Sequence, residues 1–257
     1  MRRLLIGSSL KMYFGRARQI EWTREVARIC AAHPAVQEGL VEPFVIPTFP
    51  SIPDVAPIAA EGRMLVGAQD LHWEDAGAFT GEVSAPELVE HGVRLAEIGH
   101  AERRAMFGET DETVARKVAA AMRHGIAPVL CIGEVDEGAP DAAAAACIRQ
   151  LEASLALARE AGSTGRLVVA YEPVWAIGAP APAGDDHIRA VGGALRAHLA
   201  DDPALDAQVI YGGSAGPGLL PRIADGVDGM FLGRFAHDPA AFGRILDEAH
   251  ELAEASR

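Results

Sequence analysis

One short segment places a carboxylate at the end of a strand and a stiff, apolar loop after it. Leu167–Ala170 is apolar and half β-branched, which predicts a buried strand, and Glu172 stands at its end. The loop that follows carries Trp175 and Ile177, large apolar side chains that a surface loop does not need, and Pro173 stiffens its start. Both features are explained if the loop is a lid and the glutamate is a base that works beneath it.

The lysines give a second signal, because the chain strongly prefers arginine. Of its 23 basic residues, only Lys11 and Lys117 are lysines. Lys117 falls in a helical pattern, where we expect an exposed side chain. Lys11 follows a predicted strand within a short polar stretch, where a compact ammonium could face a ligand. An incidental lysine is the alternative interpretation.

Polar residues follow other predicted strands too, and each group has a chemical and a structural interpretation. His100 could be catalytic or a hydrogen-bonded structural histidine, and Glu102 could belong to a salt-bridge cluster. Glu172 could likewise belong to a structural ion pair. The groups are Ser8-Ser-Leu-Lys11, Ile98-Gly-His-Ala-Glu-Arg-Arg104, Tyr211-Gly-Gly-Ser214, which could be only a tight turn, and Leu232-Gly-Arg234.

Short apolar strands alternate with longer amphipathic helices, and the pattern repeats eight times at about 30 residues per unit. Eight repeats of a strand followed by a helix predict one (β/α)₈ barrel domain over residues 1–257. The predicted strands are Leu4–Gly7, Phe44–Pro47, Leu65–Gln69, Arg94–Ile98, Pro128–Ile132, Leu167–Tyr171, Gln208–Gly212 and Gly229–Gly233. The predicted helices are Ala17–Ala32, Ser51–Ala60, Ala85–His91, Glu109–His124, Asp141–Ala161 with Asp141 as its cap, Asp186–Ala200, Leu219–Asp225 and Pro239–Ala253.

An open, doubly wound sheet is the main alternative fold. The count of eight strands and the lack of a Gly-x-Gly-x-x-Gly turn after the first strand weigh against it. In a barrel, active sites lie at the carboxyl ends of the strands. The joint occurrence of these polar groups at one face of one barrel therefore favours a functional site.

Composition and charge limit the partners. The formal net charge of −13 argues against nucleic acid or an anionic membrane, yet backbone N–H groups at helix starts can still bind a small anion. No apolar run approaches the ~18 residues of a membrane span, and Met1–Gly7 is too short for a secretory signal, so we expect a cytoplasmic protein. Cys30, Cys131 and Cys147 lack metal-ligand spacing and are expected to be reduced core residues. No metal or cofactor is expected.

Several of these motifs, taken in order from the first strand to the eighth, resemble the triosephosphate isomerase family. The most specific is Tyr171-Glu-Pro-Val-Trp-Ala-Ile-Gly178. The segment Gln69–Glu82 resembles the dimer loop of that family. The other matching residues are Lys11, the His100 motif, Cys131-Ile-Gly-Glu134, Tyr211-Gly-Gly-Ser214 and Asp228-Gly229.

The resemblance implies a role for each matching residue. Glu172 would be the catalytic base, His100 the electrophile and Lys11 the electrostatic stabiliser, with Glu102 also in the catalytic group. Triosephosphate isomerase is itself the reference example of this glutamate and neutral histidine pairing. Gly178, Ser214 and Gly233 match its phosphate-binding positions. Ser9 and Arg234 are also expected to contact the substrate. Thr80 would reach the site of a second subunit, which implies a homodimer.

The chain also departs from the family pattern. The family usually has Asn where Ser9 stands, Ser at Ala101 and Asn at Asp70, and a Gly where Arg234 stands. Its lid ends on a Thr-Gly-Lys-type hinge, whereas this chain has Ala179-Pro-Ala-Pro182. The changes at Ser9 and Ala101 remove about three side-chain heavy atoms near the reacting end of the substrate, room for about one extra hydroxymethyl group.

The leading hypothesis is therefore an isomerase of a four-carbon erythrulose phosphate, with ordinary triosephosphate isomerase as the runner-up. A sugar-phosphate sensor without catalysis is a different class of function, and the presence of Glu172, His100 and Lys11 argues against it. A Schiff-base aldolase is disfavoured because no predicted strand except the first has a lysine at its end.

Overall fold

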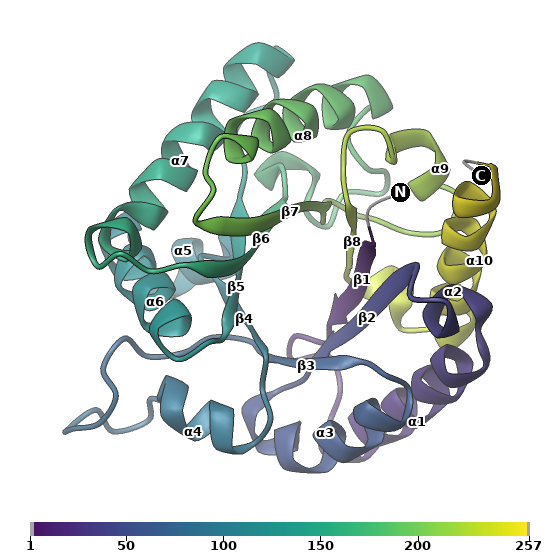
Figure 1. Cartoon of the computed structure of the whole chain (residues 1–257), viewed down its shortest axis with the longest axis horizontal. Coiled ribbons are helices and arrows are strands. Elements are labelled where there is room, and N and C mark those ends of the chain that lie inside the picture. The colour runs from purple at the N-terminus through teal and green to yellow at the C-terminus, as the bar shows by residue number, and fades with distance from the viewer. Residues whose placement is uncertain (1–2, 256–257) are drawn as a thin grey trace.

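Eight parallel strands close into a barrel in the computed structural model, which describes residues 3–255 (Figure 1). Each strand pairs with the next along the chain, and β8 pairs with β1. The strands are β1 (Leu4–Ser9), β2 (Val41–Ile46), β3 (Leu65–Ala68), β4 (Leu95–Ile98), β5 (Ala127–Ile132), β6 (Gly165–Tyr171), β7 (Leu205–Tyr211) and β8 (Gly229–Leu232). The predicted (β/α)₈ barrel is confirmed. Residues 1, 2, 256 and 257 of the predicted domain lie outside the described residues.

Helices form a ring around the barrel and cover its outer face (Figure 1). They are α1 (Arg16–Ala32), α2 (Pro34–Gln37), α3 (Ile52–Glu61), α4 (Ala85–Glu90), α5 (Ala101–Phe107), α6 (Asp111–Arg123), α7 (Pro140–Glu160), α8 (Asp185–Ala200), α9 (Leu220–Ile223) and α10 (Pro239–Ala255). Between strands and helices lies the larger apolar core, which includes Ile6, Val45, Ile98 and Val169.

A second, smaller core fills the barrel itself, because strand side chains alternate between its two faces. Leu5, Leu95, Val129, Val168 and Ile210 belong to this inner cluster. The rings of Phe44 and Phe231 stack across it with their centroids 5.8 Å apart. Gly7 is required there, since a Cβ atom at this position would lie 2.2 Å from the Phe44 ring.

Two short helices, α2 and α5, were not predicted, and the start of α7 differs from its prediction. The helix α7 begins at Pro140, and its N-cap residue Ala139 makes no side-chain cap, so Asp141 lies inside the first turn. Proline at the first helical position is favoured because its missing N–H would have no partner there. The helix α5 was missed because its seven residues include no buried side chain that would give a periodic pattern.

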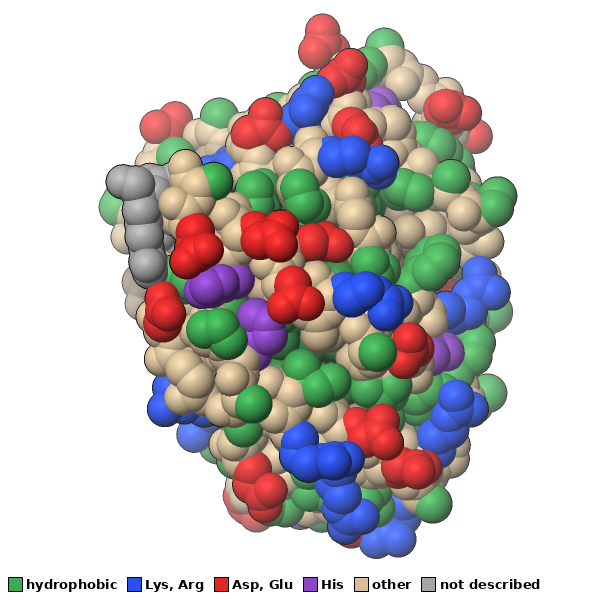
Figure 2. All heavy atoms as spheres, turned by 90° about the vertical axis from the view of Figure 1, so that its right-hand side faces the viewer, with side chains coloured by type: hydrophobic (Ala, Val, Ile, Leu, Met, Phe, Trp, Pro, Cys, Tyr) green, Lys and Arg blue, Asp and Glu red, His purple; other side chains and the backbone are tan. Residues whose placement is uncertain are grey.

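The outer surface carries charged side chains of both signs, as expected from the composition of the chain. Figure 2 shows acidic and basic side chains interspersed over the face formed by α1, α2 and α10, without a continuous basic patch there.

Cys30, Cys131 and Cys147 are buried and free, and burial raises the pKa of Cys30 and Cys147 to about 12. Between residues 3 and 255, no helix is both long and apolar enough to span a bilayer.

Candidate active site

A cavity of about 230 Å³ opens where the carboxyl ends of the strands meet, and it gathers most of the predicted site residues. Its lining includes Ser9, Lys11, His100, Glu102, Glu172, Gly178, Ser214, Gly233 and Arg234. Thr80 is the one predicted site residue that does not line it. A larger hollow of about 600 Å³ lies beside the amino-terminal half of β7 and contains none of these residues. The 230 Å³ cavity is therefore the candidate site.

Glu172 lies just beyond β6 and is 6% exposed. Neighbouring glycines make room for it: a Cβ atom at Gly212 would lie 2.5 Å from Glu172 Oε1, and one at Gly133 would lie 1.9 Å from its carbonyl oxygen. The Oε2 atom has no hydrogen-bond partner among residues 3–255. His100 Nε2 lies 3.6 Å from it, beyond hydrogen-bond distance. The carboxylate is thus buried, positioned and incompletely bonded.

His100 is the N-cap residue of α5, and this position fixes the tautomer of its neutral ring. Its Nδ1 atom accepts a hydrogen bond from the backbone N–H of Glu102 at 3.2 Å. In a neutral imidazole the proton must then lie on Nε2, which faces the Glu172 and Glu97 carboxylates at 3.6 and 3.8 Å.

Lys11 follows β1 in a left-handed conformation, with φ of 45°, which is uncommon for a residue other than glycine. Its Nζ donates to Glu102 Oε1 at 2.6 Å. Burial lowers the pKa of Lys11, but the bond to Glu102 and the charges of Glu172 and Glu97 outweigh it, so the pKa lies above its ordinary value. The ammonium therefore stays charged at neutral pH.

The loop after Glu172 is held at both ends by residues beneath it. Trp175 Nε1 donates to Glu134 Oε1 at 2.9 Å near its start, and Ala183 N donates to the Tyr211 hydroxyl at 3.0 Å near its end. Tyr171 and His187 also contact Glu134 Oε1, at 3.1 and 3.0 Å. Glu134 is therefore a buried acceptor that connects β6, the loop and α8.

The predicted phosphate-binding residues surround one end of the cavity. The Ser214 hydroxyl lies 2.9 Å from the carbonyl oxygens of Ala176 and Ala179, so it also contacts the loop. Gly233 has no atom within 4 Å of an added Cβ, which leaves open space beside it. Arg234 is exposed, and its Nη2 donates to the Gly178 carbonyl at 3.3 Å. Arg234 thus lies at the cavity mouth and contacts the loop.

The segment between β3 and α4 projects beyond the ring of helices (Figure 1). It carries Thr80, which is exposed and does not reach the cavity of its own chain. Phe79 on the same segment is 41% exposed. Trp73, by contrast, packs partly buried against the core, with Arg116 above its ring.

Ala101 does not line the 230 Å³ cavity. As the first residue of α5, it lines a neighbouring cavity of about 460 Å³ together with Cys131, Gly133 and Glu172. Glu172 lines both cavities. The expectation that Ser9 and Ala101 enlarge one pocket is therefore corrected: they make room on two sides of the same carboxylate.

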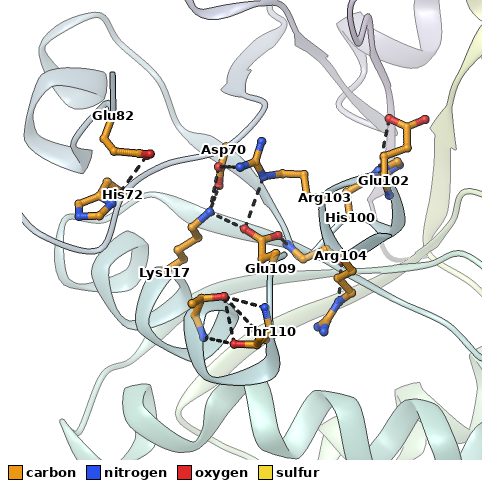
Figure 3. Close-up of polar contacts among 12 residues, drawn as sticks. Asp70, His72, Glu82, His100, Glu102, Arg103, Arg104, Glu109, Thr110 and Lys117 are labelled. Atoms are coloured by element: carbon orange, nitrogen blue, oxygen red, sulfur yellow. Dashed lines mark hydrogen bonds and ion pairs between the residues drawn. The ribbon is translucent and has the colours of Figure 1, made fainter. Parts of the chain in front are cut away.

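Behind His100 lies a buried ion-pair cluster formed by Asp70, Arg103, Glu109 and Lys117 (Figure 3). Lys117 is 5% exposed, so the prediction of an exposed lysine was wrong. Its Nζ donates to both Asp70 oxygens, at 2.7 and 2.8 Å, and to Glu109. The helical pattern predicted the correct element but could not reveal that two carboxylates, Asp70 after β3 and Glu109 between α5 and α6, contact this face.

The cluster fixes the turn that precedes His100. Glu109 Oε2 accepts a hydrogen bond from Gly99 N at 3.1 Å, and Arg104 Nε donates to the Gly99 carbonyl at 2.9 Å. Gly99 has φ of +75°, a conformation that glycine adopts without strain. Both backbone groups of the residue before His100 are thus held by side chains.

Two residues of this site were missed in the sequence. Glu134 was part of a recognised motif, but only its contacts reveal how many donors it receives. Glu97 lies on β4, and its side chain was overlooked. The sequence signal for Glu97 is its position two residues after Leu95 in a strand of four residues. Because side chains alternate along a strand, Glu97 and Leu95 both point into the barrel.

A closed parallel barrel with a buried glutamate, a histidine and a charged lysine together at its carboxyl end is the arrangement of a sugar-phosphate isomerase. The family model described as triosephosphate isomerase matches residues 4–249. The chain belongs to the triosephosphate isomerase family and is an isomerase.

Individual relatives of known name cover nearly the whole chain. The L-erythrulose-1-phosphate isomerase of Pectobacterium atrosepticum is 51% identical over 253 residues, which is 98% of either chain. The enzyme of the same name from Mesorhizobium japonicum is 38% identical over 95% of this chain and 96% of its own. A triosephosphate isomerase from a Synechococcus species is 37% identical over 96% of this chain and 97% of its own.

Proposed function

We propose that this isomerase acts on a four-carbon ketose phosphate and moves the carbonyl between the two inner carbons of an erythrulose phosphate. The observation that carries the proposal is the position of Glu172, which lies beside His100 and between two cavities. Glu172 lines both cavities, and Ala101, where the family usually has a larger residue, lines the second. The similarity to two enzymes named L-erythrulose-1-phosphate isomerase supports the same substrate.

In this proposal Glu172 is the base. It removes the proton from the hydroxyl-bearing carbon next to the carbonyl, which gives an enediolate. It then returns a proton to the former carbonyl carbon, while the proton of the neighbouring hydroxyl passes to the former carbonyl oxygen, so that the carbonyl forms one carbon further along. The Nε2–H of His100 donates a hydrogen bond to the oxygen on which negative charge develops, and the Lys11 ammonium stabilises that charge. Glu102 holds Lys11 in place through their 2.6 Å contact.

The phosphate of the substrate would bind at the opposite end of the cavity. Backbone N–H groups near Gly178, Ser214 and Gly233 suit an anion, and Arg234 adds a positive charge at the mouth. Closure of the loop over a bound phosphate would exclude water and protect the enediolate from losing phosphate. Trp175 and Ile177 give this lid apolar surface to bury.

Substrate size separates this proposal from the alternative of a triose phosphate. The same base, electrophile and lid would serve both reactions, but only the four-carbon substrate needs room beyond the reacting carbons. Ser9 on one side of Glu172 and Ala101 on the other supply it. The chemistry of Glu172, His100 and Lys11 disfavours a role as a sensor without catalysis.

The experiment compares kcat/KM for L-erythrulose 1-phosphate and dihydroxyacetone phosphate, in the wild type and in Ser9→Asn with Ala101→Ser. The wild type should prefer the four-carbon substrate. The double variant should lower that preference by about 10- to 100-fold, because one methylene-sized group in a pocket is worth roughly that much. A wild-type preference for dihydroxyacetone phosphate would overturn the proposed substrate.

We also propose that the enzyme works as a cytoplasmic homodimer. The three free, buried cysteines are typical of a reducing compartment. Large apolar side chains are exposed around the site and on the projecting loop, and a partner subunit would cover them. They are Met12, Tyr13, Phe79, Met106 and Phe107. In such a dimer, Thr80 would reach the site of the other subunit.

A further inference from the structure

Glu97 is a carboxylate inside the barrel, and the reaction as proposed above does not use it. It is 3% exposed and follows Leu95 on the inner face of β4. A carboxylate in a barrel interior costs free energy unless hydrogen bonds or a function compensate for it. Burial raises the pKa of Glu97, as does the charge of Glu172, while His100 and the bond from Ser9 oppose the shift.

The contact that matters is with Ser9. Its hydroxyl donates to Glu97 Oε2 at 2.7 Å, while Glu97 Oε1 lies 3.8 Å from His100 Nε2. Ser9 is the member of this pair that lines the candidate cavity. A serine hydroxyl has one proton and two lone pairs. Because the proton is donated to Glu97, only lone pairs remain for a ligand, so Ser9 presents an acceptor to the cavity.

An acceptor at this place selects for a hydroxyl group on the substrate. His100 lies next to the pair, so the acceptor is at the reacting end of the cavity rather than at Gly233 and Arg234. A triose phosphate ends at the reacting carbon. A four-carbon ketose phosphate extends one carbon further and carries a hydroxyl there, which can donate to Ser9.

We propose that Ser9 and Glu97 form a hydroxyl-binding pair that recognises the terminal hydroxymethyl group of the substrate. Glu97 determines specificity through the serine. It accepts the hydrogen bond from the Ser9 hydroxyl, which leaves the Ser9 oxygen as an acceptor for the substrate. The inference rests on the proposed four-carbon substrate and adds the group that recognises it. A site built to bond a substrate hydroxyl discriminates strongly against analogues that lack it.

The test compares kcat/KM for L-erythrulose 1-phosphate with that for its analogue with a terminal methyl in place of the hydroxymethyl group. In Ser9→Ala the ratio of the two values should fall by about 10- to 100-fold, the scale of one hydrogen bond assisted by a charged group. Glu97→Gln, which keeps the side-chain shape, should lower the same ratio by several-fold. The double variant should lower it no further than Ser9→Ala, because both residues act through one hydroxyl.

Ser8→Ala is the matched control. Ser8 is also buried on β1, but its hydroxyl donates to the Leu232 carbonyl at 3.0 Å, and it does not line the cavity. The ratio should therefore keep its wild-type value in this variant. Thermal melting of all variants checks that the barrel is folded, and Glu97→Gln keeps the test decisive if Ser9→Ala unfolds.

The outcomes separate this inference from the proposed function. Equal losses on both substrates in Ser9→Ala and Glu97→Gln would mean that the pair only positions His100, which overturns the inference while the four-carbon substrate stands. If the wild type prefers dihydroxyacetone phosphate, the proposed substrate fails and the inference fails with it. A fall in the ratio confined to Ser9 and Glu97 variants supports the hydroxyl-binding pair.

Discussion

At the scale of single residues, the Glu172 carboxylate combines burial with an unused hydrogen-bonding capacity. Its Oε2 atom has no partner among the described residues, and the nearest donor, His100 Nε2, is 3.6 Å away. A buried acceptor without a partner costs roughly 1–3 kcal/mol. The unbonded oxygen is therefore the atom of this carboxylate that is available to a substrate.

Glu172→Asp should lower kcat by about 10²- to 10⁴-fold and leave the fold intact. Aspartate is one methylene shorter, so the carboxylate is withdrawn from the carbon whose proton it must remove. Steady-state kinetics on the preferred substrate measures the loss, and the melting temperature serves as the control. Turnover of Glu172→Asp at the wild-type rate would show that Glu172 is not the base.

At the scale of elements, the loop after β6 depends on Glu134 for the position of its start. Tyr171 and Trp175 both donate to Glu134 Oε1, but only Trp175 belongs to the loop. The two donors therefore offer a matched comparison between a contact that acts on the lid and a contact that only stabilises the barrel.

Trp175→Phe should lower kcat several-fold more than Tyr171→Phe does. Each change removes one hydrogen bond to Glu134, worth about 1–3 kcal/mol for a charged acceptor, so the two losses of stability should be similar. Only the first loosens the lid, whose closure excludes water during catalysis. Kinetics and urea unfolding on both variants provide the comparison, and equal losses of kcat would argue against a role for the Trp175 contact in closure.

The ion-pair cluster behind His100 connects β3, α5 and α6, and Lys117 is its buried cation. Burial raises the pKa of Asp70, and the negative charge of Glu109 adds to this effect, while Lys117 and Arg103 oppose it. Removing the lysine would leave carboxylates packed together without their main counter-charge.

Lys117→Met should destabilise the protein by about 3–5 kcal/mol, because it breaks a buried ion pair by removing one partner. Arg244→Met on α10 is the control, since Arg244 pairs with Asp238 at the exposed surface and its loss should cost about 0–1 kcal/mol. Urea unfolding midpoints measure both. Similar small losses in the two variants would show that the cluster contributes little to stability.

At the scale of the whole molecule, exposed apolar side chains near the site are the surface that the proposed dimer would cover. Met12 is 92% exposed directly after Lys11, and Phe107 is 68% exposed at the end of α5. Obligate dimers bury such side chains in large hydrophobic interfaces. The projecting loop with Phe79 is the element of this chain best placed to reach another subunit (Figure 1).

Phe79→Asp should convert the dimer to a monomer at micromolar concentration and lower kcat, because Thr80 would no longer complete the partner's site. Light scattering measures the mass, and activity is measured on the same samples. Leu157→Asp is the control, since Leu157 is 37% exposed on α7, far along the chain from the loop. A fully active wild-type monomer would contradict the proposed dimer.

The barrel and the meeting of most candidate site residues could be predicted from local sequence patterns. The eightfold alternation of strand and helix depends on local periodicity and on glycine and proline at the boundaries. These features involve residues that are close in sequence, so they can be recognised without the structure. The polar residues that follow the strands could be predicted to meet, because the carboxyl ends of all strands in a closed parallel barrel share one face.

The contacts of individual side chains, in contrast, are known only from the folded structure. Lys117 is buried because Asp70 and Glu109, from other segments of the chain, pair with it, and Trp73 is partly buried because it packs against the apolar core. Ala101 opens a separate cavity because it begins a short helix that periodicity could not reveal. The contact between Ser9 and Glu97 joins residues 88 positions apart. Such contacts depend on how strands and helices pack together, and a linear pattern of residue types does not contain that geometry.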